Sequence, residues 1–169
     1  HAEGRFEESQ EFAQRYLAEG QRAADRNSVH SYMLQTLISA VDIGGLEAYE
    51  PTVRSMVHSF PRVIGWRAGL LLLLSELGRA EEARGQQQWL VRAGALSGPK
   101  GNGWFATMGG LARSSMTVRD ERISKGVYAQ LASHSGRFAV VGYCSLMWGP
   151  IAHMLGVLAN SLGWWSVAD

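Results

Sequence analysis

The chain has 169 residues, of which 46% are hydrophobic and 18% are charged, so it is too apolar for a disordered protein. Sixteen basic residues oppose fifteen acidic ones, and a net charge of +1 excludes the strong basic field typical of nucleic-acid binding. The single cysteine, Cys144, excludes an internal disulfide and is typical of a reducing compartment. We therefore expect a folded cytoplasmic domain.

Membrane insertion and export are also not expected. The longest nearly apolar stretch, residues 63–74, contains Arg67 and is far shorter than the roughly 20 residues that a membrane-spanning helix needs. The first ten residues are charged and carry no apolar run, which a signal peptide requires.

A short phrase recurs along the chain. The phrase has a glycine, an apolar residue two positions later and, in most copies, acidic residues after that. It begins at Gly4, Gly44, Gly78 and Gly163, and a degenerate copy without glycine begins at Val118. The steps between starts are 40, 34, 40 and 45 residues, within the range of helix-pair repeats. We expect each glycine to end one helix at positive φ, and the acidic residues to lie at the positive end of the next helix.

Apolar residues between these junctions have helical spacing. In chain order, the pattern predicts four pairs of helices, at about 6–17 and 33–41, 46–59 and 61–77, 80–95 and 104–116, and 120–133 with a segment ending near 162. Residues 97–103 form the clearest loop, and Val140 and Val141 favour a short extended stretch before the last helix resumes. The fold class is thus all-α, a tetratricopeptide-like solenoid of about four antiparallel helical hairpins in a single domain over 1–169.

Both ends of the chain suggest a fragment of a longer protein. The sequence opens almost on a junction and stops about one turn into what would be the next helix. Because Trp164 and Trp165 would then be exposed, we expect the isolated chain to self-associate through its terminal hairpin.

Several phrases resemble a known family. They are Gly65-Trp66-Arg67-Ala68-Gly69-Leu70, Leu77-Gly78-Arg79 with Glu81-Glu82-Ala83-Arg84, Val127-Tyr128, Gly136-Arg137, Val140-Val141-Gly142, Gly149-Pro150 with His153, Leu155-Gly156, Leu158-Ala159 and Leu162-Gly163. Their order resembles the carboxy-terminal tetratricopeptide-like region of large bacterial regulators, in which an AAA-type ATPase accompanies an adenylate or guanylate cyclase or a LuxR-type DNA-binding domain. The resemblance implies a sensing or binding role, with nucleotide chemistry and DNA binding in other domains of the same polypeptide.

The sequence contains no catalytic motif that we recognise. His-Glu-x-x-His, Gly-x-Ser-x-Gly and Cys-x-x-Cys are absent, and the five histidines have no metal-ligand spacing. The loop around Lys100 lacks the strand and the Ser or Thr of a phosphate-binding loop. Cys144 and His153 are the one pair that resembles a thiol nucleophile and its base, although a buried structural cysteine is the more common role. We expect no catalytic residue, metal or cofactor.

Aromatic residues gather on or near the second helices of the predicted pairs, and in helical-repeat proteins such helices line the concave binding surface. For any single residue, filling the core between helix pairs is the more common role. Polar anchors among aromatic residues are typical of ligand pockets, although Arg67 can equally cover a neighbouring helix with its stem. The candidate binding residues are Gln35, Trp66, Arg67, Trp104, Phe105, Tyr143, Trp148 and His153.

The leading hypothesis is a sensor or interaction module of a signalling or transcriptional regulator that binds a protein, a peptide or a small molecule. Two alternatives stay open at this stage. One is a small standalone enzyme that uses a helical-repeat pocket with Cys144, His153 or Tyr143. The other is a structural spacer or oligomerisation segment.

Overall fold

The computed structural model describes residues 3–25, 27–98, 100–101, 103–141 and 146–165. Its elements are α1 (Phe6–Arg22), α2 (Asn27–Ile43), the 3₁₀ helix η1 (Leu46–Tyr49), α3 (Glu50–Ser59), α4 (Ile64–Glu76), α5 (Ala80–Arg92), α6 (Trp104–Val118), α7 (Glu121–Ala132), β1 (Phe138–Val141), β2 (Leu146–Pro150) and α8 (Ile151–Ser161). Helices hold 72% of the residues, which confirms the mostly helical class.

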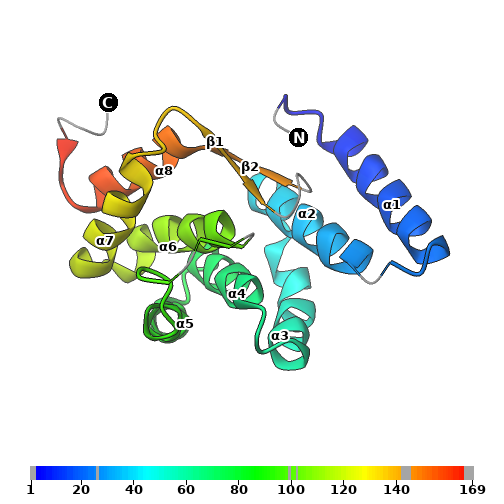
Figure 1. Cartoon of the computed structure of the whole chain (residues 1–169), viewed down its shortest axis with the longest axis horizontal. Coiled ribbons are helices and arrows are strands. Elements are labelled where there is room, and N and C mark those ends of the chain that lie inside the picture. The colour runs from blue at the N-terminus through cyan, green and yellow to red at the C-terminus, as the bar shows by residue number, and fades with distance from the viewer. Residues whose placement is uncertain (1–2, 26, 99, 102, 142–145, 166–169) are drawn as a thin grey trace.

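The α-helices associate in consecutive pairs (Figure 1). α1 packs on α2, α3 on α4, α5 on α6 and α7 on α8. The second helices of the pairs also contact one another in order, α2 with α4, α4 with α6 and α6 with α8. The core therefore runs along the second helices, and α4 and α6 share the most extensive contact.

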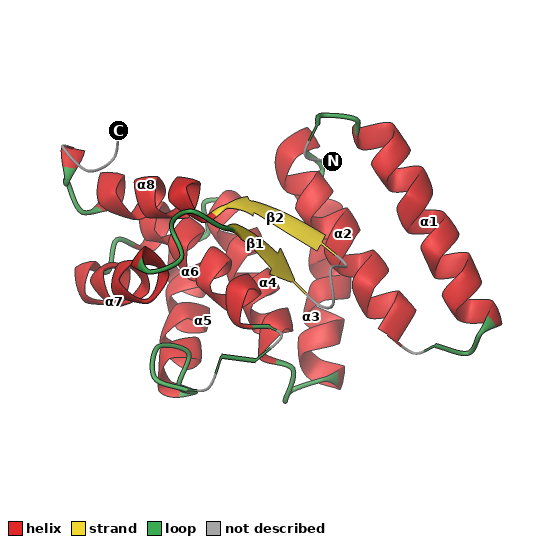
Figure 2. Ribbon diagram, turned by 45° about the horizontal axis from the view of Figure 1, so that its top comes forward, coloured by secondary structure: helices red, strands yellow, loops and turns green. Residues whose placement is uncertain are grey.

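The segment before α8 is more extended than the sequence predicts. β1 and β2 pair antiparallel, with a register shift between Ala139 and Val140. A helix resuming soon after Val141 would place Pro150 in its interior, where proline removes a hydrogen bond and clashes with the preceding turn. α8 instead begins directly after Pro150. In Figure 2 the hairpin lies across the helices, and its contacts join α2, α6 and α8.

The five leucines at positions 70–74 are buried on every side of α4. Each is at most 2% exposed. Leu72 belongs to an apolar cluster with Ile38 and Val141, whereas Leu71, Leu73 and Leu74 belong to the main core. α4 is therefore the central helix, with apolar neighbours all around it.

Small residues allow α4 and α6 to approach closely. A Cβ added at Gly110 of α6 would lie 2.8 Å from the carbonyl oxygen of Ala68 in α4. A Cβ added at Gly109 would lie 2.6 Å from the indole ring of Trp148, which covers α6 from β2. Neither position has room for a side chain, so these two glycines determine how near the helices and the hairpin lie.

We expect Gly110→Ala to destabilise the fold by about 1–3 kcal/mol, because the added methyl group would push against the α4 backbone. Gly85 in α5 is the matched control, since a Cβ there meets nothing within 4 Å. Gly85→Ala should stabilise the chain by about 0.5–1 kcal/mol through helix propensity. Urea unfolding measures both changes, and shifts of the same sign would contradict this account of the helix contact.

The glycines of the recurring phrase adopt positive φ, as predicted. Gly4, Gly44, Gly78 and Gly163 have φ of 76°, 93°, 70° and 72°. The degenerate copy makes the same left-handed turn without glycine, because Arg119 takes φ of 51° and ends α6. Asp120 then caps α7 by accepting a hydrogen bond from the backbone N–H of Ile123 at 3.0 Å. This junction is therefore formed without glycine.

Arg119→Gly should raise the free energy of unfolding by about 0.5–1 kcal/mol, because a left-handed conformation costs a residue with a Cβ about 1–2 kcal/mol, partly offset by the greater unfolded entropy of glycine. Gly78→Ala, at the corresponding turn between α4 and α5, should lower it by a similar amount. Thermal unfolding of the two variants beside the wild type checks both signs. A loss of stability in Arg119→Gly would show that the arginine side chain matters more than its backbone strain.

Four charged residues link α3 to the turn before α5. Arg54 donates to Glu50 at 2.8 Å and to Glu82 at 2.7 Å, and Arg79 donates to Glu50 at 2.6 Å and to Glu82 at 2.7 Å. The hydrogen bonds from Arg54, and then those from Arg79, lower the pKa of Glu50 and of Glu82 below the ordinary value of 4.5. The four residues form an alternating network at the surface.

The stability that this network adds should depend on pH. Because the folded-state pKa of both glutamates is lowered, the contribution is present above about pH 4.5 and disappears as the pH falls through the folded pKa. The double variant Glu50→Gln, Glu82→Gln should melt below the wild type at neutral pH and approach it in acid. Glu121→Gln, which removes a single exposed pair with Lys125, is the control. A melting-temperature difference that does not change with pH would contradict the prediction.

The two tryptophans after α8 have different environments. The Trp164 ring is half-buried and lies edge-on to Tyr128 of α7, with 5.3 Å between ring centroids, whereas Trp165 is 67% exposed. The expectation of two exposed tryptophans is therefore corrected for Trp164.

Candidate functional site

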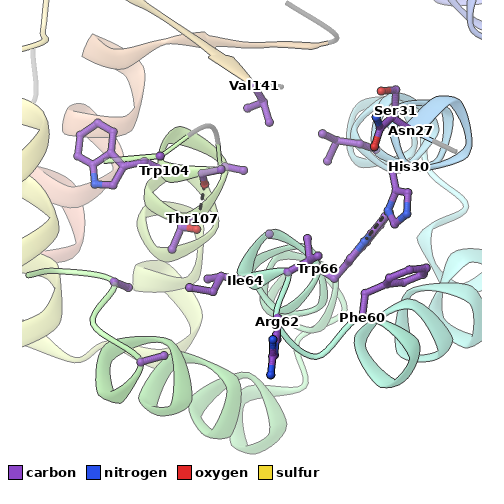
Figure 3. A pocket seen from close by; sticks show the side chains of 18 of the residues that line it. Asn27, His30, Ser31, Phe60, Arg62, Ile64, Trp66, Trp104, Thr107 and Val141 are labelled. Atoms are coloured by element: carbon purple, nitrogen blue, oxygen red, sulfur yellow. Dashed lines mark hydrogen bonds between the residues drawn. The ribbon is translucent and has the colours of Figure 1, made fainter. Parts of the chain in front are cut away.

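A cavity of about 1000 Å³ opens between α2, the beginning of α4 and the beginning of α6 (Figure 3). One wall comes from α2 and the loop before it, and a second comes from residues 60–66. The third comes from the first turn of α6 and from the residues Ala93, Gly94, Ala95, Gly98, Gly101 and Gly103. Tyr16 of α1 and Val141 of β1 complete the lining. Residues from three helix pairs thus meet in one space.

The packing of α4 against α6 explains why the cavity lies where it does. The two helices lie side by side and both begin at the cavity (Figure 3). Val63 has an extended backbone before α4, and Gly103 precedes α6. The amino-terminal ends of helices carry partial positive charge, so both contribute a field that favours negative groups.

Three rings converge on the α2 side of the cavity. The indole Nε1 of Trp66 donates a hydrogen bond to Nδ1 of His30 at 3.0 Å. The Phe60 ring lies edge-on to the His30 ring, with 4.6 Å between centroids. Figure 3 shows Trp66 and Phe60 both directed at His30. The imidazole is therefore held on two sides.

A second aromatic group lies on the α6 side. Trp104 packs edge-on to Phe105, with 4.8 Å between centroids, and to His134 at 5.6 Å. The ammonium of Lys100 lies 4.5 Å from the centre of the Trp104 ring and 3.3 Å from Nε2 of His134. Burial, and then the charges of Lys100 and Arg137, lower the pKa of His134 below its ordinary value. The lowered pKa favours the neutral form of His134, whose ring supports the Trp104 wall.

The structure brings three of the predicted binding residues to the cavity: Gln35, Trp66 and Trp104. Phe105 packs behind Trp104 and does not line the cavity. Trp148 covers Gly109 on another face of α6.

Two other predicted residues lie away from the cavity, and one cannot be placed. Arg67 stacks over the ring of Trp89 in α5 at 4.0 Å and donates to Gln86 at 3.1 Å, so it covers a neighbouring helix. His153 is exposed on α8. Tyr143 lies outside the described residues, as does Cys144, so the Cys144–His153 pair is not placed either.

Sequence reasoning missed several lining residues, among them His30, Phe60, Arg62 and Thr107. His30 is one of the five histidines that lack metal-ligand spacing in the sequence. The position of Phe60 and Arg62, just before a second helix, was a usable signal for the cavity lining. Residues just before a second helix lie at its amino-terminal end, and when such helices stack side by side these ends meet on one edge.

A smaller cavity of about 580 Å³ adjoins the first between α1, α2 and β2. Tyr16 and Gln35 line both cavities, and Phe12 and Met147 add exposed apolar surface. Its charged residues are largely paired with one another, since Arg5 contacts both Glu3 at 2.8 Å and Glu8 at 3.0 Å. The second cavity extends the apolar surface towards α1.

Within the described ranges, no group of three or more His, Cys, Asp or Glu side chains is arranged to hold a metal ion. None of the helices in these ranges is long and apolar enough to cross a membrane. Comparisons with protein-family models, with curated proteins and with solved structures found no match to this chain.

Proposed function

We propose that this chain is a binding module whose ligand enters the cavity between α2, α4 and α6. The observation that carries the proposal is the cavity itself, at about 1000 Å³ and walled by three helix pairs. Ligand pockets are typically of this size, mostly apolar, with a few placed polar groups. Four of its lining side chains, Tyr16, Phe60, Val63 and Ile64, are large, apolar and more than a third exposed. Apolar side chains exposed together in a concave site commonly mark a contact surface.

The proposal includes a tetratricopeptide-like solenoid as the architecture. Its support is the pairing of consecutive helices, the stacking of second helices and the left-handed residue at each junction. In such an arrangement, a ligand that touches α2, α4 and α6 bridges neighbouring repeats and can change how they pack. That is a physical route from binding to a signal.

The proposed setting is a sensor or interaction region of a cytoplasmic bacterial regulator, as the sequence resemblance implies. The ligand is a small molecule in this proposal, and the other domains of the same polypeptide are the partners that respond. Chemistry by the module itself is not proposed. Self-association through the exposed Trp165 is a further expectation of the same proposal.

A neutral fluorescent probe, N-phenyl-1-naphthylamine, tests the cavity without assuming charge. We expect saturable binding to the wild type, and binding weakened about tenfold or more in Ile64→Trp, because an indole at that position would fill the cavity. Fluorescence titration measures both affinities.

Val29→Trp is the matched control. Val29 is a β-branched apolar residue of α2 that is 41% exposed, and it does not line the cavity. The Val29→Trp variant should bind the probe as the wild type does. Equal affinities in the two tryptophan variants, or no saturable binding by the wild type, would contradict the proposed function.

A further inference from the structure

The hydrogen bond between Trp66 and His30 determines where the imidazole carries its proton. An indole N–H can only donate, so the Nδ1 atom that receives it at 3.0 Å must be the acceptor. Trp66 is only 5% exposed, and a buried indole N–H without a partner is costly. A proton on Nδ1 would place two donors against each other. The hydrogen bond therefore requires the tautomer of His30 that holds its proton on Nε2.

The proton on Nε2 is available to a ligand. His30 lines the cavity, and its ring is held by Phe60 and by Trp66, with centroids 4.6 Å and 5.6 Å away. In the described part of the chain, no residue forms a hydrogen bond with Nε2 of His30. The site thus presents one oriented N–H donor among apolar walls, which is the pattern of a polar anchor in a ligand pocket.

The helix ends at the cavity favour a ligand with negative charge. The two charged side chains of the lining, Asp25 and Arg62, have opposite charges, and Asp25 accepts a hydrogen bond from the backbone N–H of Asn27 at 2.9 Å. Figure 3 shows the Arg62 side chain directed away from His30. The amino-terminal ends of α4 and α6 supply the positive field there.

We propose that the ligand is a flat, largely apolar molecule bearing an anionic oxygen, such as an aromatic carboxylate, whose oxygen accepts the Nε2–H of His30. Trp66 is the positioning residue, because its indole N–H selects the tautomer. Phe60, Val63 and Ile64 supply apolar contact. This inference rests on the proposed function, since it names the ligand class of the same cavity.

Nitrogen-15 NMR of the imidazole rings of the full chain tests the tautomer directly. We expect His30 to show an unprotonated Nδ1 and a protonated Nε2, with its signals identified by their loss in His30→Asn. Adding 2-naphthoate should shift the Nε2 resonance. Trp66→Phe keeps an aromatic ring but removes the donor, and should yield a mixture of tautomers. A protonated Nδ1 in the wild type, or an unchanged pattern in Trp66→Phe, would overturn the proposal.

Competition against N-phenyl-1-naphthylamine tests the ligand class. We expect 2-naphthoate to displace the probe about tenfold more effectively than the cation 2-naphthylmethylamine, because one charge-assisted hydrogen bond is worth roughly this factor. His30→Asn keeps an acceptor for the Trp66 indole and removes Nε2. The variant should lose most of this preference, measured as the ratio of the displacement constants of the acid and the amine in that variant.

The two proposals fail in different ways. Equal displacement by the acid and the amine, or a preference that persists in His30→Asn, overturns the ligand class while the cavity still binds the neutral probe. Failure of the neutral probe to bind overturns the proposed function itself.

Discussion

The contact between α4 and α6 is the constraint on which the rest of the structure depends. The carbonyl oxygen of Ala68 lies where a side chain on Gly110 would begin, so the two helix backbones touch almost directly. This distance places the five leucines of α4 in a layer that neighbouring elements can bury completely. It also leaves Gly109 as a flat surface for the indole of Trp148, which anchors the β1–β2 hairpin on α6. A methyl group at either glycine would move every one of these contacts.

The same contact creates the cavity. Because α4 and α6 lie together and begin at the same edge, the segments that precede them converge beside α2. Trp66 and Trp104 lie in the first turns of their helices, so the packing of the helices carries both rings to the cavity walls. One of these rings engages His30 and the other is supported by His134 and Lys100. The packing of α4 against α6 therefore forms the core and also places the residues of the candidate site.

The helical part of the fold was predictable because its signals are local. A glycine that must take positive φ and an apolar stripe of helical period each depend on a few neighbouring residues. The β1–β2 hairpin was not predictable in the same way, since its strands gain their stability from contacts with α2 and α6, far away in the sequence. Arg119 shows the limit even of local signals. The turn after α6 requires a residue in the left-handed conformation, and Arg119 occupies that position. The cap by Asp120 and the burial of the flanking helices offset the backbone strain of the arginine.

The sequence by itself determined the number and order of the helices and the junctions between them. It also indicated aromatic residues on or near the second helices as candidate binding residues. Only the tertiary structure decided which of the eight candidates share a space. Arg67 and Trp148 pack against neighbouring helices, whereas Gln35, Trp66 and Trp104 line the cavity. Only the tertiary structure brought His30 to Trp66, across 36 positions of the chain. The physical reason is that helix period follows from short-range backbone geometry, whereas the direction of a side chain into a cavity depends on how whole helices pack.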